Sequence, residues 1–90
     1  MGHLKSDPEL TARVRRIAGQ LAAVERALEV EADCAAVLQQ IAAVKGAVSG
    51  LMDEVLEAHL QQHVAAPGLT DAARAQGAQE VLAAIRRYGK

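Results

Sequence analysis

Two histidines stand one helical turn apart near the end of a long helix-forming stretch, in the segment "EAHLQQHV". Side chains four residues apart on an α-helix share a face, so His59 and His63 are expected to point the same way. Such a pair could bind a metal ion. It could equally be solvated and interact favourably with the dipole at the helix C-terminus. The rest of the chain must distinguish these two interpretations.

The chain offers two further groups of this kind, which are its single cysteine, Cys34, and a histidine close to the N-terminus, His3. A lone cysteine is most often a small buried hydrophobic residue, and a lone histidine in a terminal tail is more often inert than a ligand. A single cysteine cannot close an intrachain disulfide and is compatible with a reducing compartment. These residues form a candidate metal site only if the fold brings them to His59 and His63.

The elements that would position these side chains are helices. The segment "SDPE" is a helix start, in which Ser6 can cap and Glu9 supplies the return half of a capping box. The first helix therefore begins near residue 7. The segment "EVEAD" reads as a connection, after which Asp33 can cap a second helix that runs to about Val64.

Pro67 and Gly68 end the second helix, and Thr70 can cap a shorter third helix over residues 72–88. In the first helix, apolar residues recur at steps of three and four and predict one buried stripe, which consists of Val14, Ile17, Leu21, Val24 and Leu28. The second helix repeats the pattern with Val37, Ile41, Val44, Val48, Leu51 and Val55, but so long a helix in a short chain needs a partner to bury its stripe. The third helix carries Val81, Leu82 and Ile85. The prediction is an all-α domain over residues 1–90 with an aliphatic core.

A single chain cannot bring Cys34 to His59 on one continuous helix, because 25 residues at 1.5 Å each separate them by about 37 Å. They can meet only between two copies packed antiparallel. Pairing Cys34 with residues 59 to 63 places the crossing point between about residues 46 and 49. The small residues Gly46, Ala47, Ser49 and Gly50 lie there and allow close approach, so we expect an obligate dimer.

Composition and sequence motifs bear on the partners of the protein, its location and whether it is an enzyme. The formal net charge is −1, but Arg13, Arg15 and Arg16 form a local basic cluster. Such a cluster is usually a solvated face, and nucleic-acid binding is the alternative interpretation. No stretch is apolar and uncharged for the length a bilayer needs, and there is no signal-peptide run, so we expect a cytoplasmic protein with no membrane partner. No catalytic triad or phosphate-binding glycine loop is present, so we expect no enzyme.

The segments "RVRRIAGQLAAVERAL", "DCAAVLQQIAAVKGAVSGLMDEVLEAHL" and "QQHV" resemble the CsoR/RcnR/FrmR family of bacterial transcriptional repressors over nearly the whole chain. The resemblance implies a three-helix protomer, an antiparallel four-helix-bundle dimer and a dimer of dimers. It also implies that the homotetramer binds operator DNA without effector and releases it with effector. The implied DNA contacts are Arg13, Arg15, Arg16 and Lys45.

The resemblance also bears on the effector. Copper sensors of the family use two thiolates and one imidazole, whereas His63 occupies the position of the second thiolate here. The set His3, Cys34, His59 and His63 is similar to that of the family's nickel/cobalt sensors, in which the N-terminal amine also helps to coordinate. Mixed imidazole and thiolate ligands suit Ni(II) and Co(II), and Zn(II) is also compatible.

Two alternatives remain. Formaldehyde sensors of the family keep the cysteine and the first histidine but lack the second. In such a sensor Cys34, at a helix N-terminus that favours a thiolate, would join the amine that Gly2 carries if Met1 is removed, through a one-carbon bridge. The other alternative is a helical interaction module with no effector, which would respond to neither metal nor aldehyde.

Overall fold

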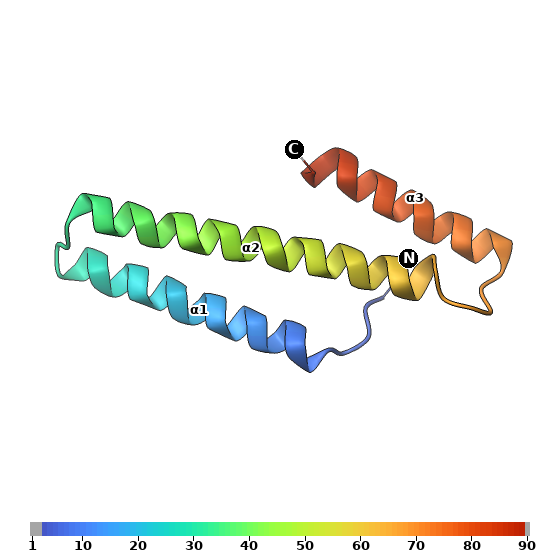
Figure 1. Ribbon diagram of the computed structural model, residues 1–90, viewed down its shortest axis with the longest axis horizontal. Helices are drawn as coiled ribbons and strands as arrows, with labels where there is room; N and C mark the ends of the chain where they lie inside the picture. The colour runs from blue at the N-terminus through green and yellow to red at the C-terminus, as the bar shows by residue number, and fades with distance from the viewer. Residues whose placement is uncertain (1–2, 90) are drawn as a thin grey trace. The chain divides into compact units, whose positions relative to one another are not determined.

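In the computed structural model, residues 3–89 are described and form three helices with no strand (Figure 1). Helix α1 spans Pro8–Glu29, α2 spans Cys34–His63 and α3 spans Asp71–Tyr88. This confirms the all-α prediction and the three predicted elements to within one or two residues. The chain divides into two compact units, which are described separately below.

Local capping explains where the helices begin and end. Asp7, rather than Ser6, caps α1, because its side chain accepts hydrogen bonds from the backbone N–H groups of Glu9 and Leu10. Thr70 caps α3 as predicted, by accepting from Ala73 N. Gly68 has φ +80° in the α2–α3 connection, a backbone conformation that glycine adopts without steric cost.

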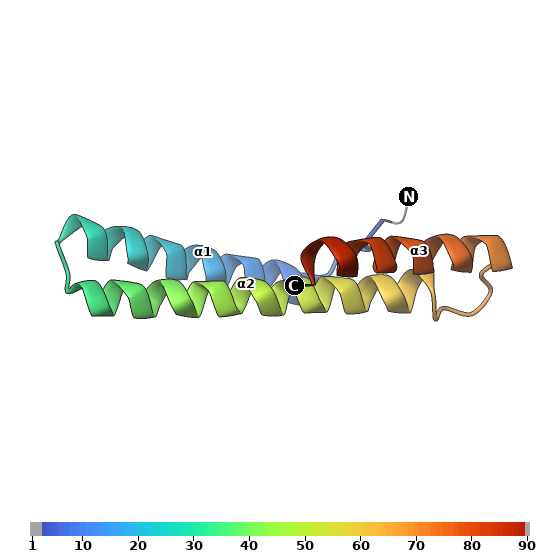
Figure 2. The ribbon, with the colours of Figure 1, turned by 90° about the horizontal axis from the view of Figure 1, so that it is seen from above.

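The first unit, Asp7–Asp53, is called the hairpin unit here. Figures 1 and 2 show α1 running antiparallel beside the N-terminal part of α2. Ile17 and Val24 from α1 pack with Val44 from α2, and the partly buried Ala47 and Leu51 extend this cluster. The core is aliphatic, as the sequence predicted.

The single chain does not bury its full apolar stripes. In the hairpin unit the predicted core residues Val14, Leu21, Leu28, Ile41 and Val48 are between 43% and 62% exposed. Two packed helices cover only one side of each other, so the second apolar edge of each helix stays uncovered. The exposed residues form a face that another chain could cover.

The second unit, called the arm unit here, draws on Met1–Ser6 and Glu54–Lys90, of which residues 3–6 and 54–89 are described. It contains the N-terminal arm, the end of α2 and all of α3. Val81 is its buried apolar residue, whereas Leu82 and Ile85 are 44% and 49% exposed. Its hydrogen bonds are described with the site.

Among the described residues, α2 is long and apolar enough to cross a membrane by length and composition, which sequence reasoning did not expect. Only 11% of its most apolar window is buried within the chain. A single helix of this length and composition is weak evidence for a membrane span. The feature therefore does not by itself indicate a membrane protein.

Candidate functional site

The two histidines near the end of α2 are adjacent, as their spacing predicted. Both are half-buried, and their ring centroids lie 4.9 Å apart with the ring planes tilted by 46°. Both belong to the arm unit. What holds each ring in place is a hydrogen bond to the main chain of a different segment.

His59 is held by α3. Its Nε2 lies 3.2 Å from the carbonyl oxygen of Gly77. A carbonyl oxygen can only accept, so Nε2 must carry the proton of this hydrogen bond. In the neutral ring, Nδ1 then keeps its lone pair, which is the form in which an imidazole binds a metal ion.

His63 is held by the N-terminal arm in the same way. Its Nε2 lies 2.8 Å from the carbonyl oxygen of His3, so it too acts as the donor and leaves Nδ1 with a lone pair in the neutral ring. The backbone N–H of Lys5 donates to Gln62 Oε1 over 3.2 Å. Two consecutive residues of α2 therefore bind the main chain of the arm.

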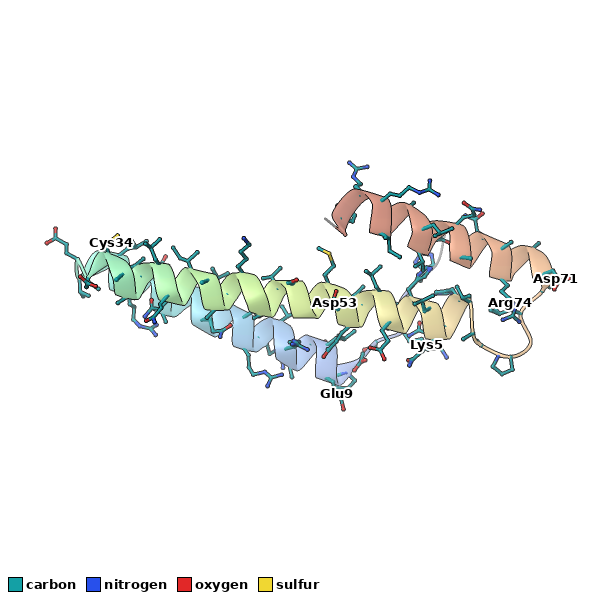
Figure 3. The ribbon with its side chains drawn as sticks, turned by 45° about the horizontal axis from the view of Figure 1, so that its top comes forward. Lys5, Glu9, Cys34, Asp53, Asp71 and Arg74 are labelled. Carbon is teal, nitrogen blue, oxygen red and sulfur yellow. The ribbon has the colours of Figure 1, made fainter. Side chains whose placement is uncertain are left out.

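The start of α3 is fastened to the end of α2. The guanidinium of Arg74 donates to the carbonyl oxygen of Val64, just past the last residue of α2, and Figure 3 shows Arg74 on the first turns of α3 beside the connection. Gly77, one turn later, is buried. Beside these contacts is a cavity of about 280 Å³ lined by Leu4, Val55, Leu56, His59, Glu80, Val81 and Ala84.

Cys34 is the first residue of α2 and is exposed (Figure 3). It belongs to the hairpin unit, whereas His3, His59 and His63 belong to the arm unit. Within residues 3–89, no three His, Cys, Asp or Glu side chains gather as metal ligands. The structure thus brings together His59, His63 and the main chain of His3. The N-terminal amine and Gly2 lie outside the described residues.

The predicted DNA-contacting residues all lie in the hairpin unit. Arg15 and Arg16 on α1 and Lys45 on α2 are exposed. Arg13 differs, because it is half-buried and its guanidinium lies close to Gly50: a Cβ added there would be 2.8 Å from Arg13 Nη2. Arg15, Arg16 and Lys45 are therefore the more accessible cations.

Sequence reasoning missed Gln62, Arg74 and Gly77. The identities of Gln62 and Arg74 carry no signal, because long polar residues are ordinary on helix surfaces. Gly77 did carry one, since an isolated glycine inside a helical pattern often has a packing reason. The contact of Gly77 with the main chain of His63 could not have been found from the sequence, because it depends on how α3 packs against α2.

Comparison with known proteins identifies the family. The family described as "Metal-sensitive transcriptional repressor" matches residues 6–87. The chain is 52% identical, over the whole of both chains, to an uncharacterized protein in the bioA 5′ region of Serratia marcescens. It is 41% identical, again over the whole of both chains, to the transcriptional repressor RcnR of Salmonella arizonae.

A solved structure is also similar. It is a Glu-to-His variant of the Formaldehyde-Responsive Regulator FrmR from Salmonella enterica serovar Typhimurium, with 45% sequence identity and a TM-score of 0.83. The match covers 93% of this chain and 99% of that one. Sequence and fold agree over nearly the full length, so the chain belongs to the CsoR/RcnR/FrmR family of metal-sensitive transcriptional repressors.

Proposed function

We propose that the chain is a nickel- or cobalt-responsive repressor that binds operator DNA without metal and releases it when metal binds. The observation that carries this proposal is the pair of adjacent imidazoles whose Nε2 atoms are both engaged by main-chain carbonyls. Each ring then has Nδ1 available as a ligand atom. Two histidines at positions i and i+4 of a helix can bind the same metal ion.

The proposed ligand set is His59 and His63 of one chain, Cys34 of a second chain, and His3 with the N-terminal amine. A thiolate with imidazoles suits Ni(II), Co(II) and Zn(II), and the arm would supply the extra ligands that favour Ni(II) and Co(II). The hydrogen bond from His63 to the main chain of His3 already keeps the arm beside the histidine pair. Bound metal would supply a strong link between the arm, the end of one α2 and the start of another.

The proposed assembly is an antiparallel four-helix dimer that pairs into a tetramer, with each chain acting as a single sensing and DNA-binding domain. The exposed apolar residues of the hairpin unit support this, because Val14, Leu21 and Leu28 recur every seven residues along α1. A repeat of seven residues places side chains on one face of a helix, as in a helix-packing seam. Gly46 has no atom within 4 Å of an added Cβ, so that surface of the chain is open.

The proposed DNA surface is the basic cluster Arg13, Arg15 and Arg16 together with Lys45. Cationic side chains bind phosphates and release counterions, which gives salt-dependent affinity. A protein that acts on operator DNA in a bacterium works in the cytoplasm. Metal binding would shift the assembly away from its DNA-binding arrangement, by no more than the difference in its affinity for the two arrangements.

Formaldehyde is the second candidate effector, favoured by the exposed thiol at the start of α2 and by the likeness to the FrmR structure. In this reaction the amine nitrogen and the Cys34 sulfur each form a bond to the formaldehyde carbon. Its oxygen leaves as water with one proton from each partner. No second imidazole is required, so His63 has no role in this chemistry.

The test is operator binding by the purified protein while Ni(II), Co(II), Cu(I), Zn(II) and formaldehyde are titrated in turn. The operator can be selected from random DNA with the metal-free protein. We expect Ni(II) and Co(II) to release the DNA. Release by formaldehyde alone would establish the second candidate, and retention of DNA under all five conditions would contradict both.

A further inference from the structure

The central glycine of α3 is unusual for its position. Glycine is less favourable than alanine inside a helix, yet Gly77 stands among alanines and glutamines in the middle of α3. It is also one of the two buried residues of that helix, with Val81. A buried glycine inside a regular helix indicates that another group occupies the space of its side chain.

That group is the main chain of His63. A Cβ added to Gly77 would overlap the carbonyl oxygen of His63 and would lie 2.8 Å from its carbonyl carbon and 3.0 Å from its Cβ. These atoms belong to the backbone or its first branch, so no side-chain rotation can move them aside. Any larger residue at position 77 must push α3 away from the end of α2.

The same residue also holds the other histidine. The carbonyl oxygen of Gly77 accepts the hydrogen bond from His59 Nε2. Arg74, three residues earlier and so on the same side of α3, donates to the carbonyl of Val64. The close approach of Gly77 to His63 and the hydrogen bond from His59 to Gly77 therefore depend on the same position of α3 against α2.

We propose that Gly77 is a positioning residue of the effector site. The absence of a side chain lets α3 lie against His63, and this approach brings the Gly77 carbonyl to His59 and fixes the ring with Nδ1 available. Gly77 acts through His59 and itself touches no effector. This inference rests on the proposed function for its effect on metal binding, but its effect on the His59 ring can be measured without metal.

The experiment compares full-length wild-type protein with Gly77→Ala. In the wild type we expect a slowly exchanging His59 Nε2–H proton in NMR spectra of the metal-free protein, with a nuclear Overhauser effect to α3. In Gly77→Ala this signal should be lost. Affinity for Ni(II) should fall by about 10- to 100-fold, the usual effect of removing an outer partner of a metal-binding histidine.

Gly19→Ala is the matched control, because Gly19 is exposed in α1 and an added Cβ would meet nothing within 4 Å. It should keep both the proton signal and the Ni(II) affinity. Metal-free Gly77→Ala should bind operator DNA within about twofold of the wild type, which separates a changed effector site from loss of the DNA surface.

Retention of the His59 signal and of Ni(II) affinity in Gly77→Ala would overturn the inference. If Gly77→Ala does not fold, the wild type decides: a His59 Nε2–H that exchanges rapidly and shows no contact with α3 would overturn it as well. If the wild type does not respond to Ni(II) or Co(II), the proposed function fails. The NMR comparison still decides the role of Gly77.

Discussion

The hairpin unit and the arm unit are stabilised by different kinds of contact. The hairpin unit has a cluster of aliphatic side chains, Ile17, Val24 and Val44, whose attraction has no preferred direction. The arm unit adds directional hydrogen bonds, from His59 to Gly77 and from His63 to His3. Apolar side chains can also pack against another copy of the chain. Hydrogen bonds of fixed geometry can instead orient the histidine nitrogens that would bind a metal ion.

The two units also differ in what they leave unfinished. In the hairpin unit, alternate apolar positions of α1 are buried and exposed: Ile17 is 7% exposed while Leu21 is 53% exposed. The unit therefore resembles half of a core. In the arm unit, hydrogen bonds already orient both histidine rings. The proposed metal site therefore lacks only its remaining ligands. In the proposed assembly, a second chain supplies both the missing apolar cover and the Cys34 ligand.

The prediction with the largest expected effect tests whether Cys34 in the hairpin unit of one chain and His59 in the arm unit of another bind the same metal ion. Cys34→Ala and His59→Ala should each weaken Ni(II) binding by more than about 100-fold, because each removes a direct ligand. When the two variants are unfolded together and refolded as a mixture, heterodimers should carry one intact site. Random pairing makes half of the dimers mixed, so about a quarter of the wild-type sites should return.

The control is a mixture of Cys34→Ala with the double variant Cys34→Ala/His59→Ala, which offers no intact combination. Isothermal titration calorimetry with Ni(II) counts the sites in both mixtures. If the first mixture recovers no more sites than the control, Cys34 and His59 do not meet between chains. The hairpin unit of one chain and the arm unit of another then do not form a shared metal site.

The second effect separates metal from aldehyde within the arm unit. His63→Ala should weaken the release of DNA by Ni(II) and Co(II) by about 10- to 100-fold, because Gln62 offers only an amide and points to another side of the helix. Release by formaldehyde needs Cys34 and an amine and should survive the substitution. Operator binding measured by fluorescence anisotropy gives both responses.

His3→Ala is the companion variant. It should lower Ni(II) and Co(II) affinity more than Zn(II) affinity, because Zn(II) accepts four ligands whereas the other two ions accept six more readily. Its main-chain carbonyl, which His63 contacts, is retained in this variant. Full nickel and cobalt responsiveness in His63→Ala would move the assignment to the aldehyde sensor.

The third effect concerns the unfinished core of the hairpin unit. Ile17→Ala should lower the free energy of unfolding by about 2 to 4 kcal/mol, because it leaves a cavity in the aliphatic cluster. Leu21 is half exposed in the single chain, so its replacement by Ala would cost only about 0.5 kcal/mol if the chain stood alone. If a second chain covers it, the cost should rise to about 2 kcal/mol.

Thermal unfolding at two protein concentrations distinguishes these cases, since the melting temperature of an obligate dimer depends on concentration. Gln20→Ala, at an exposed polar position next to Leu21, serves as the control and should have little effect. A melting temperature independent of concentration, together with a near-neutral Leu21→Ala, would leave the exposed apolar face without a partner.

Sequence patterns predicted the helices well because the signals that define them are local. Thr70 and the break at Pro67 and Gly68 act over a few residues, so the ends of α2 and α3 were found closely. The cap of α1 was misplaced by one residue, since Ser6 and Asp7 are both good caps and only the backbone decides between them. These errors did not affect which residues share a helix.

The candidate site was only partly predictable. The adjacency of His59 and His63 followed from helical periodicity, and the structure confirms it. The hydrogen bonds that orient both rings did not follow, because they use carbonyl groups, which every residue possesses. The exposure of each apolar residue could not be predicted for a related reason: periodicity shows which residues form an apolar stripe, not whether the same chain or a second chain covers it.

The smallest expected effect concerns the charged surface of the hairpin unit. Arg16 is exposed, so Arg16→Ala should remove one phosphate contact, weaken operator binding by about 5- to 10-fold and reduce the salt slope by about one. Arg13 is half-buried beside Gly50, and we expect Arg13→Ala to weaken operator binding with a smaller change in salt slope. Binding isotherms at four salt concentrations give both quantities.

Arg26→Ala is the matched control for this prediction, because Arg26 is an exposed arginine in the last turn of the same helix, outside the basic cluster. It removes the same charge from the chain and should leave the salt slope unchanged. If Arg16→Ala and Arg26→Ala alter the slope equally, the effect reports net charge rather than a contact. If neither alters it, α1 does not meet the phosphate backbone, and the hairpin unit serves assembly alone.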